Sequence, residues 1–346
     1  CVPIGSRVFG IPDAIGNTGI LFDTENDLEK YSNELNDTER KITLFHSQIM
    51  NDVLNKYNKE IDLIGFHGQT IFHDSKKKIS RQLGDAKLLS QITKKIIVSN
   101  FRHNDLINGG QGAPLTPIFH RLISNSIVKK NKISFPLNIL NIGGISNLTQ
   151  IVSNNNLIDS NLFASDIGPG NCLIDEWVRK NSNKKFDNNG ELARSGKVND
   201  LVFNQALDNF SKDFYERSLD IKDFDIIFAK GLSLEDGCAT LTKFTAYLIA
   251  QGIEHMNSSN KLQSVNNLVC GGGRKNSFLM KNIIDNFKNK KAKLTNIDQY
   301  GLDGDYIESQ CFAYLAVRKY LELPISFPST TGCKNPTIGG KVNKNF

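Results

Sequence analysis

The sequence lacks the features that mark several protein classes. It contains no apolar run near the roughly 20 residues that a transmembrane helix needs, so we expect no membrane association. Its six cysteines are far apart and form no C-x-x-C pair, which argues against a disulfide framework or a zinc site and indicates reduced thiols in a cytoplasmic protein. The histidines also lack metal-ligand spacing, so we expect no metal site built from protein side chains.

A dominant charge is missing as well. Lys and Arg number 42 against 36 Asp and Glu, and the net charge of +6 is spread over short clusters such as KKKISR and NKKAK. We interpret these clusters as solvated surface and expect no nucleic acid partner. The chain opens on Cys1 and not on Met, so we expect its start to be incomplete.

Helical and strand patterns alternate along most of the chain. This alternation predicts an α/β protein, and 346 residues with 39% hydrophobic content predict two domains with a boundary near residue 130. The main expected elements are helices at 36–57, 239–256 and 308–321, strands at 61–66 and 70–73, and a hairpin that turns at Gly143 and Gly144.

The first expected helix is amphipathic. Asp37 or Thr38 is its expected N-cap. Its apolar positions recur at helical spacing, so we expect it to face the core through Ile42, Phe45, Ile49, Val53 and Leu54.

Strand ends run into glycine-rich turns with polar neighbours, in the stretches HGQT, GGQGAP, NIGGISN and CGGGRKN. Glycine permits positive φ and lets backbone amides approach a ligand closely, so such turns suit phosphate and sugar oxygens. A tight turn needs glycine even when nothing binds, so each turn alone has a purely structural interpretation. Together they favour a ligand site.

The stretch ASDIGPGNCLIDEW places Asp166 just before a glycine corner. We expect a strand to end at Ser165, so that the carboxylate of Asp166 lies at its C-terminal edge, and we expect Asn171 to cap the next helix. A carboxylate held beside such a corner can act as a general base. The alternative is that Asp166 only caps the turn through its own backbone.

Two other charged residues have two interpretations each. Arg102 follows a strand in NFRHND, where it could bind a carboxylate or phosphate or form an ordinary surface salt bridge. Glu308 precedes the last helix, where it could meet a ligand or only stabilise the first helical turn. Residues 115–123 are apolar enough for a core or for a contact between two copies, so a homodimer stays open.

Several motifs occur together and in one order: GFHGQTIFH, NFRHNDLINGGQGAPLTPIFH, LNIGGISNLT, SDIGPGNCLIDEW, LVCGGGRKN and STTGCKNP. From about residue 36 to about residue 341, the chain resembles the anhydro-N-acetylmuramic acid kinase family. The resemblance implies the sugar kinase, actin and Hsp70 (ribonuclease H-like) fold, in which two α/β lobes enclose a central cleft. Residues 1–130 would form the sugar-contacting lobe. Residues 131–346 would carry the catalytic aspartate and the nucleotide loops, with the last segment able to pack back on the first lobe.

The resemblance also implies a carbohydrate kinase that uses ATP and Mg²⁺. Such an enzyme phosphorylates O6 of 1,6-anhydro-N-acetylmuramic acid while water opens the anhydro ring, which gives N-acetylmuramic acid 6-phosphate and ADP in peptidoglycan recycling. By resemblance, Asp166 is the catalytic base, and Thr70, Arg102 and Glu308 bind the sugar. The residues that resemble the nucleotide side are Gly143, Gly144, Asn147, Gly271, Gly272, Gly273 and Asn276.

The opening of the chain departs from the family pattern. The family holds the ATP phosphates with a Gly-Thr-Ser-x-Asp-Gly loop, whereas this chain has Phe9-Gly10-Ile11 followed by Pro12, which lacks an amide hydrogen. Two hypotheses therefore stand beside the active kinase. One is a sugar-binding remnant without turnover, and the other is a different phosphoryl-transfer enzyme of the same fold.

Overall fold

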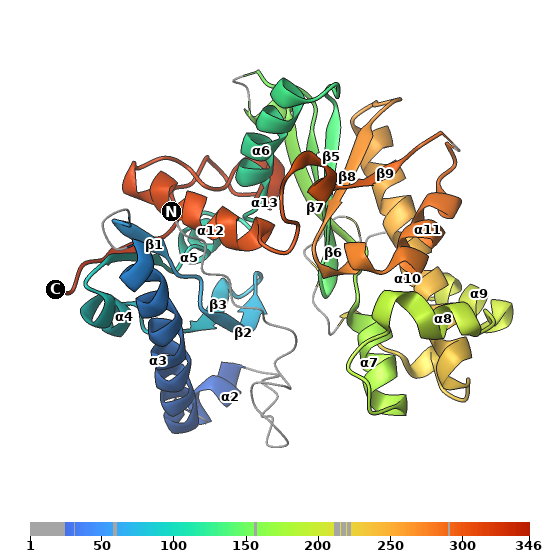
Figure 1. Cartoon of the computed structure of the whole chain (residues 1–346), viewed down its shortest axis with the longest axis horizontal. Coiled ribbons are helices and arrows are strands. Elements are labelled where there is room, and N and C mark those ends of the chain that lie inside the picture. Colours follow the sequence, from blue (N-terminus) through green and yellow to red (C-terminus); the bar gives the residue numbers. More distant parts are fainter. Residues whose placement is uncertain are drawn as a thin grey trace. The chain divides into compact units, whose positions relative to one another are not determined.

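The computed structural model describes residues 25–30, 32–57, 61–155, 158–210, 215, 219, 223–289 and 291–346. The altered opening loop lies outside these residues. The chain forms two compact units (Figure 1). Unit 1 combines the described residues up to Phe119 with Glu308–Phe346, and unit 2 is the continuous stretch His120–Ile307. The chain passes from unit 1 to unit 2 inside helix α6 (Pro117–Lys130), nearer its start than residue 130.

The described part of unit 1 contains a three-stranded sheet in the order β1-β4-β10 and a separate β2–β3 hairpin. β1 is parallel to β4, whereas β10 from the end of the chain is antiparallel to it. The expected strands at 61–66 and 70–73 are therefore present, as β1 and β2. The elements are α2 (Glu25–Lys30), α3 (Ser32–Tyr57), β1 (Leu63–Gly65), β2 (Gln69–Asp74), β3 (Ile79–Leu83), α4 (Ala86–Thr93), β4 (Ile96–Ser99), α5 (His103–Ile107), α12 (Ile307–Tyr320), α13 (Pro328–Thr331) and β10 (Lys341–Asn343).

The first long helix, α3, is present, but its expected cap is wrong and its expected buried face is only partly right. Of the predicted core residues, Leu54 is buried and Ile42 and Val53 pack against buried clusters, whereas Ile49 is 39% exposed. Asp37 and Thr38 lie inside the helix, and the hydroxyl of Thr38 donates to the backbone oxygen of Glu34. Phe45 is 60% exposed, while Thr43 is fully buried. The hydroxyl of Thr43 is satisfied because it donates within the helix and accepts from the amide of Asp85 at 2.9 Å. A satisfied hydroxyl can occupy a core position, so the apolar pattern alone placed the face only partly correctly.

The described part of unit 2 holds a five-stranded sheet in the order β7-β6-β5-β8-β9. The expected hairpin is confirmed as β5 and β6, which turn through Gly143 and Gly144. β6 is antiparallel to both neighbours, so β5, β7, β8 and β9 run in one direction and end at the same edge. The strands are β5 (Leu137–Ile142), β6 (Ile145–Ile151), β7 (Leu162–Pro169), β8 (Asn266–Cys270) and β9 (Leu294–Asn296). Both units combine helices with sheets, which confirms the α/β class.

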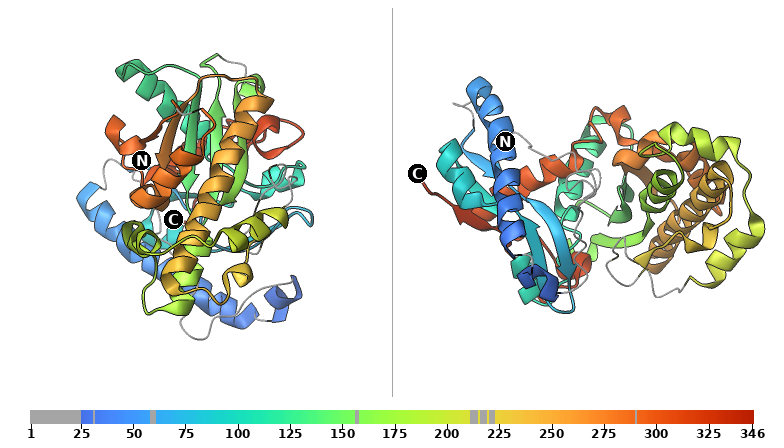
Figure 2. Two further views of the ribbon diagram at one scale, coloured as in Figure 1. Left: turned by 90° about the vertical axis from the view of Figure 1, so that its right-hand side faces the viewer. Right: turned by 90° about the horizontal axis from the view of Figure 1, so that it is seen from below.

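Helix α10 (Leu234–Ser259) crosses one face of this sheet (Figure 2). Its Ala246, Ile249 and Ile253 pack against Leu140 and Ile167 of the strands in a fully buried cluster. Burying a side chain of the size of Leu or Ile contributes about 1.5–3 kcal/mol, so this contact is a main source of stability for unit 2. The remaining helical segments of unit 2 are η3 (Ile158–Ser160), α7 (Cys172–Asn181), η4 (Asn188–Gly190), α8 (Glu191–Ser195), α9 (Asp200–Asp208), η7 (Ile227–Ala229), η8 (Gly272–Lys275), α11 (Ser277–Asn286) and η9 (Ile297–Tyr300).

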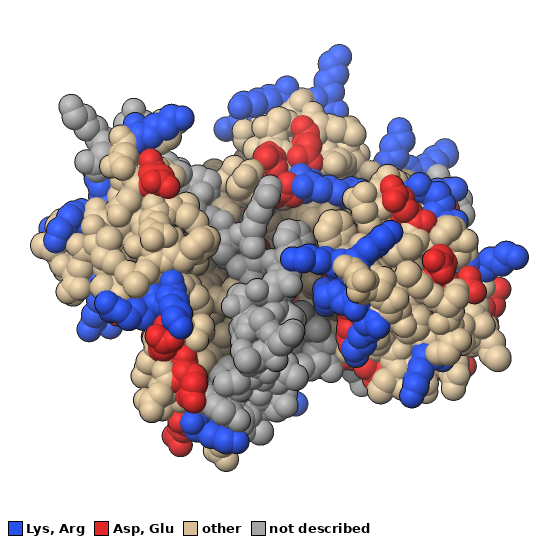
Figure 3. All heavy atoms as spheres, turned by 60° about the horizontal axis from the view of Figure 1, so that its bottom comes forward, with Lys and Arg blue, Asp and Glu red and all other residues tan. Residues whose placement is uncertain are grey.

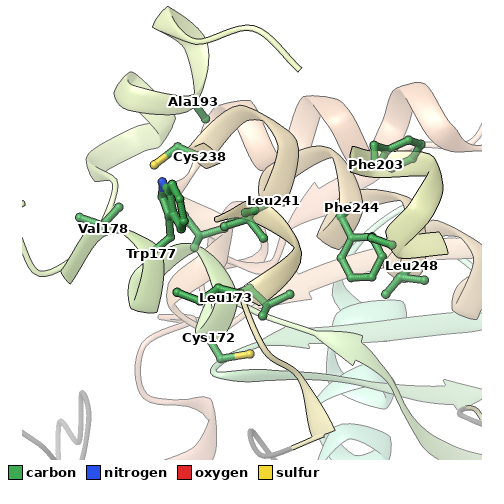
Figure 4. Packing of buried hydrophobic residues seen from close by; sticks show 14 residues of the cluster. Cys172, Leu173, Trp177, Val178, Ala193, Phe203, Cys238, Leu241, Phe244 and Leu248 are labelled. Atoms are coloured by element: carbon green, nitrogen blue, oxygen red, sulfur yellow. The ribbon is translucent and has the colours of Figure 1, made fainter. Parts of the chain in front are cut away.

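A second apolar cluster lies between α10 and the helices α7, α8 and α9 (Figure 4). Trp177 belongs to this cluster, and its ring nitrogen donates to the backbone oxygen of Leu234 at 3.0 Å. A Cβ at Gly237 would lie 2.2 Å from the Trp177 ring, so glycine is required there. This packing fixes α7, the helix that follows the corner after Asp166.

The surface carries mixed charge. Figure 3 shows Lys and Arg side chains interspersed with Asp and Glu over the face drawn. Within the described ranges, none of the helices combines the length and apolar character that crossing a bilayer requires. The apolar stretch at 115–123 is largely internal, because Leu115, Ile118, Phe119 and Ile123 are each buried, although Leu122 is 44% exposed.

Candidate active site

Glycine turns of unit 2 converge at the carboxyl edge of its sheet. The amides of Gly170 and Asn171 donate to the backbone oxygens of Gly144 and Gly143, both at 2.8 Å. The turn after β8 lies against the same place, because a Cβ at Gly273 would lie 3.2 Å from the side-chain oxygen of Asn171. The turns of NIGGISN, GPGN and CGGGRKN therefore form one surface, as expected for the point where parallel strands end.

Packing explains some of these glycines and leaves Gly143 unexplained. A Cβ at Gly170 would lie 2.2 Å from the oxygen of Gly143, and Cβ atoms at Gly271 and Gly273 would come within 2.4 Å of Asn141 and 2.2 Å of Ile142. At Gly143 the nearest atom would be 3.5 Å away, an ordinary contact. Packing within this unit therefore leaves room for a Cβ atom at Gly143, so close contact with neighbouring protein atoms does not explain this glycine.

Asp166 lies inside β7, three positions before its end at Pro169. The expectation that the strand ends at Ser165 is wrong, because β7 stays paired with β6 as far as Pro169 opposite Ile145. Asp166 is 8% exposed, and the amide of Leu219 donates to its Oδ2 at 2.8 Å. The carboxylate is thus held in one position on a rigid element.

A β-bulge adjoins Asp166. Asn147 of β6 pairs with Asp166, but the next residue, Ser146, pairs with Gly168, so Ile167 is an extra residue on β7. Gly168 has a φ of +148°, a value that glycine adopts without strain. Bulges of this kind redirect side chains and occur often beside active sites.

Two asparagines of the glycine-rich turns, Asn171 and Asn276, form hydrogen bonds with the protein backbone. Asn171 occupies the N-cap position of α7, but its side chain does not cap the helix and donates instead to the oxygen of Gly143 at 3.2 Å. Asn276 accepts from the amide of Leu279 and caps α11. The helix cap thus uses the Asn276 oxygen, so a contact between this residue and nucleotide would come from its amide nitrogen.

Arg274 anchors the turn after β8. Its side chain is 4% exposed, its Nε donates to Asp298 at 2.7 Å and its Nη1 donates to Asp305 at 2.6 Å. The Nη1 atom also donates to the backbone oxygen of Gly271 at 3.0 Å. An arginine paired with carboxylates in this way holds the glycine turn in a fixed shape.

In unit 1, Arg102 is held by a histidine and a glycine turn. Its Nε donates to Nε2 of His67 at 3.0 Å, and its Nη1 donates to the backbone oxygen of Gly112 at 2.8 Å. The Nδ1 atom of His67 lies 2.9 Å from the oxygen of Gly68. Burial, aided by the charge of Arg102, lowers the pKa of His67 from 6.5 to about 3. His67 is therefore neutral, with Nδ1 as donor and Nε2 as acceptor.

The same turn connects to Thr70. Thr70 accepts from the side chain of Gln82 at 3.2 Å, and Gln82 also donates to Ser80 at 2.7 Å. Ser80 lies 3.0 Å from His73, whose Nε2 lies 2.9 Å from the oxygen of Gln111 in the GGQGAP stretch. The β2–β3 hairpin that carries Thr70 and the turn that holds Arg102 are thus joined by hydrogen bonds.

Glu308 lies in the first turn of α12 and is exposed. Its pKa is nevertheless raised, because desolvation outweighs the opposing effect of the Arg102 guanidinium. Arg102 and Glu308 therefore share one electrostatic environment within unit 1. Of the predicted residues, the structure joins Arg102, Glu308 and Thr70 in unit 1, and it joins Asp166, Asn147 and the glycine turns in unit 2.

Some residues of these sites were missed from the sequence. Asp105 is fully buried and accepts from the amide of Gly112 at 2.7 Å and from the hydroxyl of Thr331 at 2.6 Å, so it fixes the GGQGAP turn. Arg274 lies inside a quoted motif but had no assigned role, and its carboxylate partners Asp298 and Asp305 lie far away in the sequence. His67 was expected to form a hydrogen bond inside its turn, and its contact with Gly68 confirms this, whereas its contact with Arg102 could not be predicted from a local pattern.

Comparisons with known proteins identify the family of this chain. A family model described as anhydro-N-acetylmuramic acid kinase matches residues 4–345. The chain is 50% identical over 322 residues to the anhydro-N-acetylmuramic acid kinase of Pelagibacter ubique (strain HTCC1062), covering 92% of this chain and 84% of that protein. It is 40% identical over 310 residues to the enzyme of that name from Zymomonas mobilis, covering 88% and 80%.

Among solved structures, the activator of the 2-hydroxyisocaproyl-CoA dehydratase from Clostridium difficile with bound ADPNP matches with a TM-score of 0.31 and 14% identity, over 55% of this chain and 65% of that chain. That likeness is too weak to indicate function. The family match, in contrast, spans nearly the whole sequence and includes both groups of site residues. The chain therefore belongs to the anhydro-N-acetylmuramic acid kinase family.

Proposed function

We propose that this protein phosphorylates O6 of 1,6-anhydro-N-acetylmuramic acid with ATP while water opens the anhydro ring. The products are N-acetylmuramic acid 6-phosphate and ADP, and the process is peptidoglycan recycling in the cytoplasm. Membership of the family supports the reaction. The observation that carries the proposal is the Asp166 carboxylate, held at the strand edge where the Gly143 turn leaves space for a ligand.

In this proposal, Asp166 takes a proton from the water that attacks C1. Phosphoryl transfer itself depends on placement and on neutralisation of charge. The Gly143–Gly144 turn and the Gly271–Gly273 turn would hold the nucleotide through the amides of Gly144, Gly272 and Gly273, because the amides of Gly143 and Gly271 already donate to the backbone oxygens of Ile145 and Gly304. Mg²⁺ is commonly held through phosphate oxygens and waters with one or two carboxylates, so it would bind together with ATP and neutralise the phosphates.

Thr70, Arg102 and Glu308 would bind the sugar. The substrate carries a lactyl carboxylate, and the guanidinium of Arg102, oriented by His67 and Gly112, is suited to bind it. The carboxyl group of Glu308, which interacts electrostatically with Arg102, would form a hydrogen bond with a sugar hydroxyl.

The test is ADP release by purified protein given ATP, Mg²⁺ and the anhydro sugar. Asp166→Asn keeps the shape of the side chain but removes the base, so turnover should fall by about 10²–10⁴-fold while calorimetry still shows both ligands binding. Asp159→Asn, at an exposed position, is the matched control and should retain full activity. Sugar binding without any ADP from the wild type would instead support the remnant hypothesis.

A further inference from the structure

A polar row crosses the sheet of unit 2 beside Asp166. Asn141 of β5 is paired directly with Asn147 of β6, and Asn147 is paired directly with Asp166 of β7. Side chains directly opposite on neighbouring strands point to the same face, with Cβ atoms about 4.5–5.5 Å apart. The amide of Asn147 and the carboxylate of Asp166 are therefore adjacent.

This row lies on the face away from α10. Leu140, Ile142 and Leu148 alternate with Asn141 and Asn147 along the strands, and these three apolar residues pack in the cluster against α10. The two asparagines therefore point to the opposite face. The bulge at Ile167 keeps Asp166 in register with Asn147, while Ile167 itself is buried in the α10 cluster.

Asn147 has an unsatisfied acceptor at this position. Its Oδ1 is buried and has no hydrogen-bond partner within the described protein. A buried carbonyl oxygen without a donor costs about 1–3 kcal/mol, and in native proteins such an atom usually has an ordered water or a ligand as its partner. Water supplies two O–H donors. Two donors are the number needed to pair with both the Asn147 oxygen and the adjacent carboxylate.

We propose that Asn147, which the resemblance assigns to the nucleotide side, instead holds the attacking water for Asp166. This inference rests on the proposed function. The water donates one O–H to Oδ1 of Asn147 and the other to the carboxylate of Asp166, which leaves a lone pair directed toward C1 of the sugar. Asn147 thereby touches the reacting water and contributes to the step as an acceptor only.

The water oxygen forms a bond to C1, the bond between C1 and O6 breaks, and O6 takes the γ-phosphoryl group from ATP as ADP leaves. The proton that faced Asp166 passes to that carboxylate. The hydrogen that faced Asn147 stays on the oxygen and becomes the hydrogen of the new C1 hydroxyl, so Asn147 neither gains nor loses a proton.

The experiment compares wild type, Asn147→Ala and Asn147→Asp in kcat, in the KM for ATP and in the pH profile of kcat/KM. Asn147→Ala should lower kcat by about 10–100-fold with the KM for ATP within twofold, because only the water loses its acceptor. Asn147→Asp keeps an acceptor but adds a second carboxylate, which raises the pKa for ionising Asp166. The acidic limb of the kcat/KM profile of Asn147→Asp should therefore move up by at least about one pH unit, and the activity of this variant should recover at alkaline pH.

The matched control is Asn266→Ala, which removes an exposed asparagine at the far end of β8 and should behave as wild type. Wild-type kcat in Asn147→Ala, or an unchanged acidic limb in Asn147→Asp, would overturn this inference and leave the proposed function intact. A wild-type protein that makes no ADP would overturn the proposed function and this inference with it. If Asn147 were only structural, its substitution would lower the thermal midpoint without moving the acidic limb of the kcat/KM profile.

Discussion

Arg102 donates from its Nε to Nε2 of His67 at 3.0 Å, and this contact requires His67 to be neutral. The lowered pKa of about 3 keeps the ring neutral throughout the physiological range. The guanidinium would lose this acceptor if the ring carried a second proton. His67 thus sets the orientation of Arg102, which we propose binds the sugar.

Replacing His67 should weaken sugar binding. A hydrogen bond to a charged group contributes about 1.5–3 kcal/mol, so His67→Ala should raise the KM for the sugar about tenfold or more with a smaller change in kcat. His67→Gln retains an acceptor and should recover part of the loss. Steady-state kinetics check this, with the exposed His103→Ala as control. Equal sugar KM values for His67→Ala and wild type would contradict the role assigned to His67.

His120 should make the protein sensitive to acid. It is fully buried, its Nδ1 lies 2.7 Å from the hydroxyl of Thr149, and burial lowers its pKa from 6.5 to about 3. Between pH 6.5 and pH 3, the unfolded chain therefore binds more protons at His120 than the folded protein does. The free energy of unfolding falls as the pH drops from about 6.5 toward 3, and this histidine does not affect it at higher pH.

The corresponding variant is His120→Gln, studied by urea unfolding at pH 7.5 and pH 4.5. From pH 7.5 to pH 4.5, the free energy of unfolding of the wild type should fall by about 2–3 kcal/mol more than that of the variant, since each pKa unit corresponds to about 1.36 kcal/mol. The carboxylates that titrate in both proteins cancel in this difference. Equal losses would show that His120 does not carry the lowered pKa.

A buried amide network should be costly to break. Asn138 is fully buried and donates to Asn257 at 3.1 Å and to Asn267 at 2.9 Å, while Gln150 donates to it at 3.0 Å. Asn138→Leu removes these three hydrogen bonds, although Gln150 still donates to Asn257 at 2.8 Å, so the free energy of unfolding should fall by about 2–4 kcal/mol. Chemical denaturation measures this, with Asn204→Ala at an exposed position as the control, expected within about 0.5 kcal/mol of wild type.

The glycines of the site should separate into two classes. A Cβ at Gly170 would meet the backbone oxygen of Gly143 at 2.2 Å, whereas a Cβ at Gly143 would meet nothing closer than 3.5 Å. Gly170→Ala should therefore lower the thermal midpoint by several degrees. Gly143→Ala should keep that midpoint and raise the KM for ATP, because the added methyl group enters the proposed phosphate space. Identical behaviour of the two variants would remove the distinction.

Local patterns predicted the elements well and the contacts between them poorly. The β5–β6 hairpin was predictable because a pair of glycines separates two β-type runs. The buried face of α3 was not, because Thr43 is made suitable for the core by Asp85, a residue far along the chain. The base at Asp166 could be proposed from its own neighbours, but its adjacency to Asn147 depends on strand register and on a bulge.

Unit 1 is assembled from both ends of the chain, and this affects how the protein emerges from the ribosome. The side chain of Asn343 in β10 donates to the backbone oxygen of Ile97 in β4, across 246 residues of sequence. Unit 2 is continuous, so its residues are all synthesised before β10 exists. Domains generally fold as units during synthesis, so unit 2 completes first while β4 waits for its antiparallel partner. The sheet next to the Arg102 turn is therefore completed only after β10 has been synthesised.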